Sequence, residues 1–333
     1  MTESSTPDKI QHVSRLSEVT LQVGVMFGVL TAVVMVTGWY DPNFFSAFSI
    51  RSVLRDTAIW SLFALGQAVV IISGGIDLSV GSLVCFLGVL TVVFSQSDLA
   101  LPFPLVMLLI MLIAASIGVF HGLLICKLDL QPFLVTLCSL LTFRGLARVI
   151  TQDRTMSFNP AELPILRELG AGIWWGIPVP VFVLVGVLVP LGLFMHFTVS
   201  GRYLFAIGSN IEAARFSGVR VNLLRTCAYA LCSILAALAA ILEAGDVGSI
   251  PPSSAGLAYE MYGITGAVLG GCALRGGQGS LIGVVLGMGI LRVIKSSIVF
   301  LGINTYWTFA VTGIVLLAAV IIDSTIRRRR ANK

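Results

Sequence analysis

Charged residues are scarce in this sequence. Only 11% of its 333 residues are charged, whereas 57% are apolar, and the mean hydropathy is +0.98. A soluble domain carries roughly 25% charged residues, so the composition excludes a water-soluble enzyme, a disordered chain and a disulfide scaffold. The sequence instead predicts an all-α, polytopic integral membrane protein that contacts lipid.

Motifs for catalysis and metal binding are also missing. The three histidines, His12, His121 and His196, are far apart, and no two of the six cysteines form a C-x-x-C pair. The phosphate-binding pattern G-x-x-x-x-G-K-[ST] does not occur. We therefore expect no enzymatic activity, no metal and no cofactor held by this chain. Energy for any active transport has to come from a partner or from an ion gradient.

Apolar stretches dominate what is present. A membrane-spanning helix needs about 20 apolar residues, and the uncharged runs predict ten such helices in a transmembrane domain over residues 19–322. A polar tail precedes this domain at 1–18, and a basic tail follows it at 323–333. The predicted spans are residues 19–40, 57–76, 78–97, 99–126, 131–150, 179–197, 226–242, 261–274, 281–299 and 306–322.

The distribution of Lys and Arg predicts the orientation. Ten spans place both termini on one side, which receives 13 basic residues against 4 on the other. Basic residues are retained in the cytoplasm, so both termini are predicted to be cytoplasmic, and the net charge of +5 indicates a membrane rather than nucleic acid. The 13 are Lys9, Arg15, Lys127, Arg202, Arg215, Arg220, Arg225, Arg275, the arginines of 327–330 and Lys333, and the 4 are Arg51, Arg55, Arg154 and Arg167.

Two glycine-rich segments interrupt the apolar pattern, at residues 74–82 and 270–280. Both begin with Gly-Gly, end with Gly-Ser and connect an inward-running span to an outward-running one. Glycine-interrupted segments in two halves are the expected trace of an internal repeat. The residues concerned are Gly74, Gly75, Asp77, Ser79, Gly81 and Ser82 in the first segment, and Gly270, Gly271, Gly276, Gly277 and Gly279 in the second.

A basic cytoplasmic segment at about 200–225 contains the pattern E-A-A-x-x-x-G. Ser209 or Asn210 is placed to cap a short helix, and Gly218 to end it. Such a helix shows small side chains and suits docking into a groove on another protein; the alternative is an ordinary basic loop. The helix would carry Glu212, Ala213, Ala214 and Arg215.

Several charges fall within or beside apolar spans. Asp77 is either an ion or pore-lining site, or a structural group that satisfies the backbone with Ser79 where the helix breaks. Arg144, Arg292 and Lys295 either pair across helices or extend to an interface.

Three acidic residues surround the predicted outer loop at 244–259. Glu243, Asp246 and Glu260 are expected to form a solvated acidic rim, or alternatively a docking site for a soluble partner.

These motifs together identify a resemblance. G-G-I-D-L-S-V-G-S at 74–82, E-A-A-R-F-S-G at 212–218 and L-G-G-C-A-L-R-G-G-Q-G-S at 269–280 resemble the membrane permease of ribose-type sugar ABC importers, in order over residues 42–322. The resemblance implies that Glu212, Ala213, Ala214 and Gly218 dock on a cytoplasmic ATPase. It also implies a second permease chain, identical or homologous, a periplasmic or extracellular sugar-binding protein, and a prokaryotic inner membrane.

The chain departs from the family pattern at some positions. Where relatives commonly read Y-E-L-D-A-I-A-A, residues 259–266 read Y-E-M-Y-G-I-T-G, so Tyr262 replaces the second acid. Cys272, Ala273 and Arg275 also differ from the common G-G-T-S-L-x-G-G. The sugar therefore stays open among ribose and other monosaccharides. Two rival hypotheses are an ion-coupled secondary transporter in which Asp77 titrates, and a related ABC permease for nucleosides or amino acids.

Overall fold

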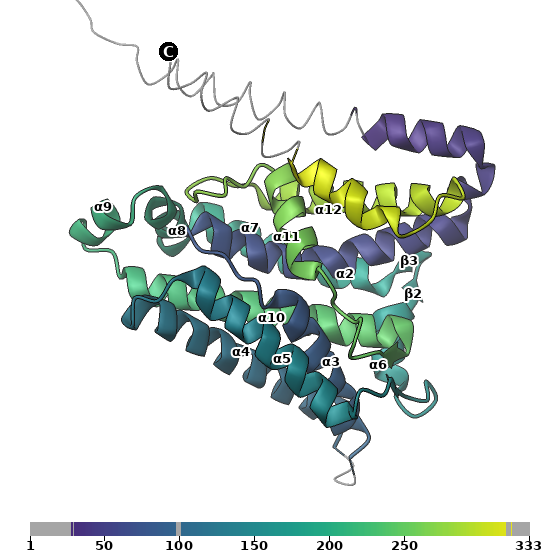
Figure 1. The fold of residues 1–333 in the computed structure, drawn as a ribbon, viewed down its shortest axis with the longest axis horizontal. Coiled ribbons are helices and arrows are strands. Elements are labelled where there is room, and N and C mark those ends of the chain that lie inside the picture. The colour runs from purple at the N-terminus through teal and green to yellow at the C-terminus, as the bar shows by residue number, and fades with distance from the viewer. Residues whose placement is uncertain (1–27, 29, 98–100, 318–320, 322–333) are drawn as a thin grey trace, which may run out of the picture.

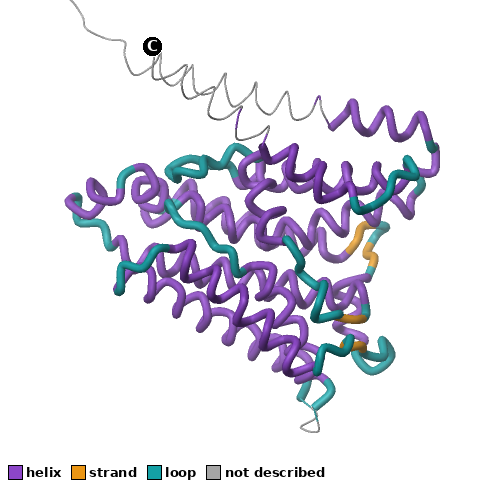
Figure 2. Tube along the Cα trace, in the orientation of Figure 1, coloured by secondary structure: helices purple, strands orange, loops and turns teal. Residues whose placement is uncertain are grey.

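A computed structural model describes residues 28, 30–97, 101–317 and 321 and is mostly helical in these parts (Figures 1 and 2). The predicted tails at 1–18 and 323–333 lie outside the described residues. The long helices, in chain order, are α2 (Ala47–Ile72), α3 (Val80–Ser95), α4 (Phe103–Lys127), α5 (Pro132–Thr151), α7 (Val179–Phe197), α10 (Val221–Val247) and α12 (Leu281–Phe300).

Shorter elements connect these helices. Two antiparallel strand pairs lie near the end of the molecule opposite α9, with Met156 opposite Ile250 and Ile173 opposite Pro178. The shorter elements are the helices Leu30–Tyr40, η1 (Pro42–Phe45), α6 (Pro164–Ala171), α8 (Val199–Ser209), α9 (Ile211–Phe216), α11 (Tyr259–Leu269) and Trp307–Leu317, and the strands β1 (Met156–Ser157), β2 (Ile173–Trp174), β3 (Ile177–Pro178) and β4 (Ser249–Ile250).

Six helices of the described chain are long and apolar enough to cross a membrane: α2, α4, α5, α7, α10 and α12. The prediction of a helical, multi-pass membrane protein is therefore confirmed. Two predicted spans, 78–97 and 261–274, coincide with the shorter helices α3 and α11. Both are short because glycine- and proline-containing segments, 73–79 and 251–258, replace the helix on their N-terminal side.

The two central helices are longer than the uncharged runs predict. The expected spans were 57–76 and 226–242, but α2 begins at Ala47 and α10 continues to Val247. Charged residues inside these helices find partners on other helices: Arg55 pairs with Asp246 at 3.0 Å, and Asp56 pairs with Arg292. A paired charge does not end a helix, so a count of uncharged residues underestimates both lengths.

The core is built around α2 and α10. The apolar windows of these helices are mostly buried, whereas α4, α5 and α7 are mostly exposed and present apolar side chains outward. Figure 1 shows α2 and α10 between α11–α12 on one side and α3–α5 on the other, in agreement with their packing partners. The exposed apolar faces are typical of helices that contact lipid or another subunit.

Glycines permit a close crossing of α4 and α10. A Cβ atom on Gly118 or Gly122 of α4 would lie 2.5 Å from the Cα of Ala230 or Thr226 of α10. Side chains at these two glycines would therefore push α4 away from the core. Close approach through glycine is a common packing mode between membrane helices.

Candidate functional site

The short helix predicted after Ser209 or Asn210 is present as α9. The Asn210 side chain accepts a 3.0 Å hydrogen bond from the Ala213 amide, so Asn210 is the N-cap. Gly218 has a φ of +79°, and its amide bonds the Arg215 carbonyl as the chain turns away. Figure 1 places α9 at one tip of the molecule.

The residues of α9 point in two directions. Ala214 is buried with Ile207 of α8 and Val221 of α10, and this small cluster anchors the helix. Glu212 and Arg215 are exposed and only 3.5 Å apart, and the Phe216 side chain next to them is 89% exposed. Polar and aromatic groups on an anchored helix form a surface that another protein can contact.

The first glycine-rich segment ends α2 and starts α3. Gly74 has a φ of +78°, which lets the chain leave α2 sharply. Asp77 is fully buried, and its Oδ1 accepts hydrogen bonds from the Ser79 amide at 2.8 Å and the Ser79 hydroxyl at 2.6 Å. The Ser82 hydroxyl donates to the Ser79 carbonyl at 2.7 Å. This is the bonding that the structural interpretation of Asp77 predicts, although Oδ2 has no hydrogen-bond partner within the described chain.

The second glycine-rich segment lies against the first. The Gly277 amide donates a 2.9 Å hydrogen bond to the carbonyl of Ile72, the last residue of α2. A Cβ atom on Gly276, whose φ is +86°, would lie 2.9 Å from the Gly74 Cα and from the Gly208 carbonyl oxygen. Only glycine at position 276 allows this contact between backbones.

The basic segment at about 200–225 joins the same cluster through Gly208, near the end of α8. A Cβ atom there would collide with the Ile72 carbonyl and the Gly277 amide. Three sequence motifs, separated by up to about 200 residues, therefore meet through backbone contacts at one end of α2. Sequence reasoning missed Gly208. The local sequence feature that could have indicated Gly208 is its position two residues before Asn210, the N-cap of α9.

Other glycines of the second segment pack elsewhere. Gly270 lies against the backbone of Gly283 in α12, and Gly279 lies beside the Cys272 sulfur and Ile72. Gly271 has a φ of +88° at the end of α11. In the first segment, Gly75 lies under the Tyr229 hydroxyl, and Gly81 lies against the Gly256 carbonyl.

The predicted acidic rim is wrong. Asp246 pairs with Arg55, and each side chain is about one-fifth exposed. Glu243 accepts a hydrogen bond from the Tyr259 hydroxyl, and Glu260 is half-buried. The reason is that α10 extends past both acids of its last turns, which places them against α2 and α11 instead of in a solvated loop. Because these acids are bound by neighbouring side chains, the structure also does not support an acidic docking site for a soluble partner here.

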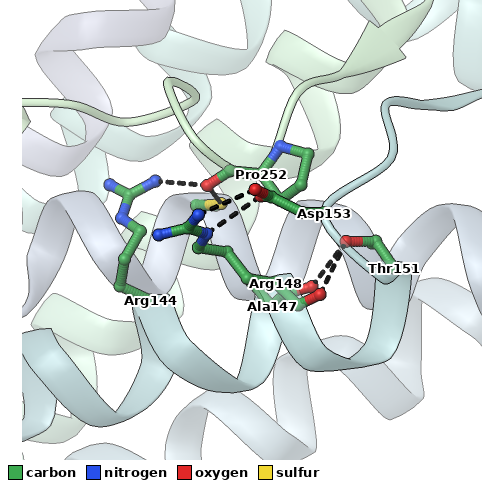
Figure 3. A network of polar contacts seen from close by, with 7 residues as sticks. Arg144, Ala147, Arg148, Thr151, Asp153 and Pro252 are labelled. Carbon is green, nitrogen blue, oxygen red and sulfur yellow. Dashed lines mark hydrogen bonds and ion pairs between the residues drawn. The ribbon is translucent and has the colours of Figure 1, made fainter.

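Arg144 holds the loop that follows β4 (Figure 3). Its guanidinium donates hydrogen bonds to the Pro252 carbonyl at 3.0 Å and to the Ala255 carbonyl at 2.5 Å. The Cys85 thiol shares the Pro252 carbonyl at 3.5 Å. Arg144 thus bridges α5 to the 251–258 segment through backbone carbonyls, and it forms no ion pair within the described residues. A cavity of about 170 Å³ lies between this segment, α3 and α10, with Val84, Glu243, Ser254 and Tyr259 in its wall.

A second arginine of α5 forms an exposed pair in the same view. Arg148 contacts Asp153 at 2.7 Å. The charge-assisted hydrogen bond from Arg148 holds the pKa of the Asp153 carboxyl below its usual range. This pair closes the turn after α5. Within the described residues, no three His, Cys, Asp or Glu side chains are grouped so that they could hold a metal ion.

Comparison with known proteins decides the family. A family model described as the permease component of branched-chain amino acid transport systems matches residues 49–320. The chain belongs to this permease family. This match covers most of the chain and all of the motif cluster around Ile72.

Relatives with curated names come from sugar transport systems. The ribose import permease protein of Escherichia coli K12 is 32% identical over 296 residues, which are 89% of this chain and 91% of the relative. That of Bacillus subtilis is 34% identical, with 91% and 92% covered, and the xylose transport system permease protein of E. coli K12 is 30% identical, with 95% of each chain covered. No solved structure matches the chain significantly.

Proposed function

We propose that this protein is the permease subunit of a binding-protein-dependent ABC importer that carries a monosaccharide, ribose or a similar sugar, across a prokaryotic inner membrane. The similarity to ribose and xylose permeases over about nine-tenths of the chain supports the substrate class. The observation that carries the mechanism is the contact of Gly208 with Ile72 and Gly277, because it connects the cytoplasmic helix to the central span.

In this proposal α9 docks on a cytoplasmic ATPase that binds and hydrolyses ATP. Glu212, Arg215 and Phe216 supply the exposed contact surface, and Ala214 fixes α9 to α8 and α10. A displacement of α9 by the ATPase would then pass through α8 to Gly208 and from there to the end of α2. In this proposal the chain performs no covalent chemistry. It opens the solute pathway alternately to the two sides of the membrane.

The proposal includes ten spans in two related halves. The helices make reciprocal contacts: α2 packs against α11 and α12, and α10 packs against α3 and α4. Both central helices end at a left-handed glycine, Gly74 or Gly248, with φ of +78° and +76°, and a short helix follows each. These features favour a repeat that relates residues 47–151 to 221–317, with the 74–82 segment equivalent to 248–256 rather than to 270–280.

Partners complete the importer. Both termini are cytoplasmic in this proposal, since the excess of basic residues lies on the side of α9. A second permease chain covers an exposed apolar face, and an extracellular or periplasmic sugar-binding protein delivers the solute to the opposite end. The monosaccharide is chosen mainly by that binding protein.

Reconstitution tests the proposal. The chain is placed in proteoliposomes with its cognate ATPase, and uptake of radiolabelled monosaccharides is measured with and without the binding protein and ATP. Uptake that requires all components supports an ABC importer. Uptake by the chain alone, driven by a proton or sodium gradient, would replace this proposal with the ion-coupled transporter. A binding protein specific for nucleosides or amino acids would change the substrate class.

A further inference from the structure

A cavity of about 230 Å³ lies between the first part of α2 and the last part of α12. Its polar groups come from both helices, and phenylalanines stand at its ends. The lining residues used here are Ser52, Asp56, Arg292, Lys295, Phe48 and Phe300.

The charged side chains that line the cavity are one acid and two bases, so the lining has an excess of one positive charge. Glu243 of α10 interacts electrostatically with Lys295 from outside this lining. Arg292 forms an ion pair with Asp56, so these two charges balance. Lys295 also lines the cavity, and within the described chain its amine has neither a hydrogen bond nor an ion pair. Its Nζ lies 5.1 Å from the ring centroid of Trp60, which contributes a cation–π contact but no hydrogen-bond acceptor.

Arg292 has donors without acceptors. Its side chain is only 9% exposed, yet Nε and Nη1 have no hydrogen-bond partner among the residues that the structure describes. The guanidinium carbon lies 4.2 Å from the ring centroid of Trp60, so the aromatic ring fixes its plane. A buried cationic donor that lacks an acceptor costs more than one that is paired, and the cost is removed when an acceptor enters.

We propose that this cavity binds one anionic group, a carboxylate or a phosphate, through Arg292 and Lys295. A fork of guanidinium donors suits the two oxygens of such a group, and the nearby ammonium supplies the matching charge. The Asp56 carboxylate pairs with Nη2 of Arg292. The donors Nε and Nη1 of Arg292 are therefore left for the ligand. The hydroxyl of Ser52 is available for a further polar group of the ligand.

The position of the cavity favours the transported solute as the carrier of this group, an inference that rests on the proposed function. In the proposed orientation, residues 48–56 and 292–300 lie in the outer half of the membrane, where a solute from the binding protein arrives first. Tyr262, which stands where relatives commonly carry an acid, packs on Trp60 with ring centroids 4.9 Å apart. The neutral Tyr262 side chain adds no negative charge beside Trp60, and the cavity lining keeps its excess of one positive charge. The solute class is then an acidic monosaccharide, such as a uronic acid or a sugar phosphate.

Matched pairs of sugars test the binding step with the full purified chain in detergent. The thermal midpoint is measured at constant ionic strength with galacturonate against galactose, and with ribose 5-phosphate against ribose. We expect an anionic probe to raise the midpoint and its neutral counterpart to leave it unchanged. Arg292→Gln and Lys295→Gln are expected to weaken the apparent affinity about tenfold or more.

Three variants separate binding from folding. Arg292→Gln leaves Asp56 unpaired and can lower stability by itself, whereas Lys295 has no ion-pair partner in the described chain, so Lys295→Gln reports on binding. Lys295→Arg is expected to retain binding. Arg154→Gln removes an exposed arginine far from the cavity and serves as the matched control. The proposal is overturned if no anionic probe raises the thermal midpoint more than its neutral counterpart does. It is also overturned if Lys295→Gln binds the anionic probe as tightly as wild type.

A parallel experiment with an anionic lipid identifies the source of the anionic group. Phosphatidylglycerol is added to the same detergent samples, and the stabilisation that depends on Lys295 is compared with that of the soluble probes. Stabilisation by phosphatidylglycerol that soluble anions do not compete with would assign the site to a lipid headgroup and overturn the solute assignment. This assay needs neither ATPase nor uptake, so its failure leaves the importer proposal standing, and a failed reconstitution leaves the binding result standing.

Discussion

The amide of Gly277 donates a 2.9 Å hydrogen bond to the carbonyl of Ile72, the last residue of α2. Ile72 is fully buried, and the carbonyl that accepts this bond also lies against Gly208. The end of the central helix is thus held by two segments that are distant in sequence. One of them leads within two residues to the N-cap of α9, Asn210.

A side chain at position 208 is expected to break this contact. In Gly208→Val, the new Cβ would collide with the Ile72 carbonyl and the Gly277 amide. Overpacking of this kind costs about 1–3 kcal/mol, so we expect a lower thermal midpoint and little ATP-dependent uptake. Gly192→Val in α7 is the matched control, because nothing lies within 4 Å of a Cβ there. Equal behaviour of the two variants would show that the contact is not required.

Substitution of Asp77 distinguishes its two interpretations. Asp77→Asn keeps a side-chain oxygen that can accept from the Ser79 amide and hydroxyl, whereas Asp77→Ala removes it. If the role is structural, Asn retains most uptake and Ala loses stability, by about 1 kcal/mol or more for the lost hydrogen bonds to Ser79. Uptake and thermal midpoints of both variants are the measurements. Loss of uptake in Asp77→Asn with an unchanged midpoint would instead indicate a titrating site.

Arg144 is predicted to keep the 251–258 segment in place. Arg144→Gln removes two hydrogen bonds to the Pro252 and Ala255 carbonyls, each worth about 1.5–3 kcal/mol when the donor is charged and the site is shielded. The expected result is faster cleavage of this segment by an externally added protease. Arg148→Gln is the control, because its pair with Asp153 is exposed and exposed pairs contribute little. Equal cleavage rates would contradict the assignment.

Local features of the fold could be predicted from the sequence, and distant ones could not. The cap at Asn210 and the turn at Gly218 depend on neighbours within a few residues, and both are present. The limits of α2 and α10 depend on pairs such as Arg55 with Asp246, which are 191 residues apart. Counting uncharged residues treats those charges as helix ends, because nothing in the linear sequence shows that they neutralise each other.

The same limit applies to the candidate site. The glycine-rich segments were recognised as motifs, but a linear sequence cannot show that Gly276 lies against Gly74 or that Gly208 joins them. Their meeting depends on how α2, α8 and α11 end in space. Pairing of Arg292 across helices was one of the two expectations, but its partner Asp56 could not be named, because the charges lie 236 positions apart, on helices that pack together only in the folded bundle.

The exposed face of α9 gives the sharpest test of coupling to an ATPase. Glu212→Lys reverses a charge that is 62% exposed and that pairs with the exposed Arg215, so stability is expected to change by no more than about 0.5 kcal/mol. If α9 docks on the ATPase, this variant keeps its thermal midpoint but loses co-purification with the ATPase and ATP-driven uptake. Glu162→Lys, an exposed acid at the opposite end of the molecule, is the control and is expected to keep both. Normal uptake by Glu212→Lys would remove α9 from the mechanism, since a docking surface cannot be indifferent to an inverted charge at its centre.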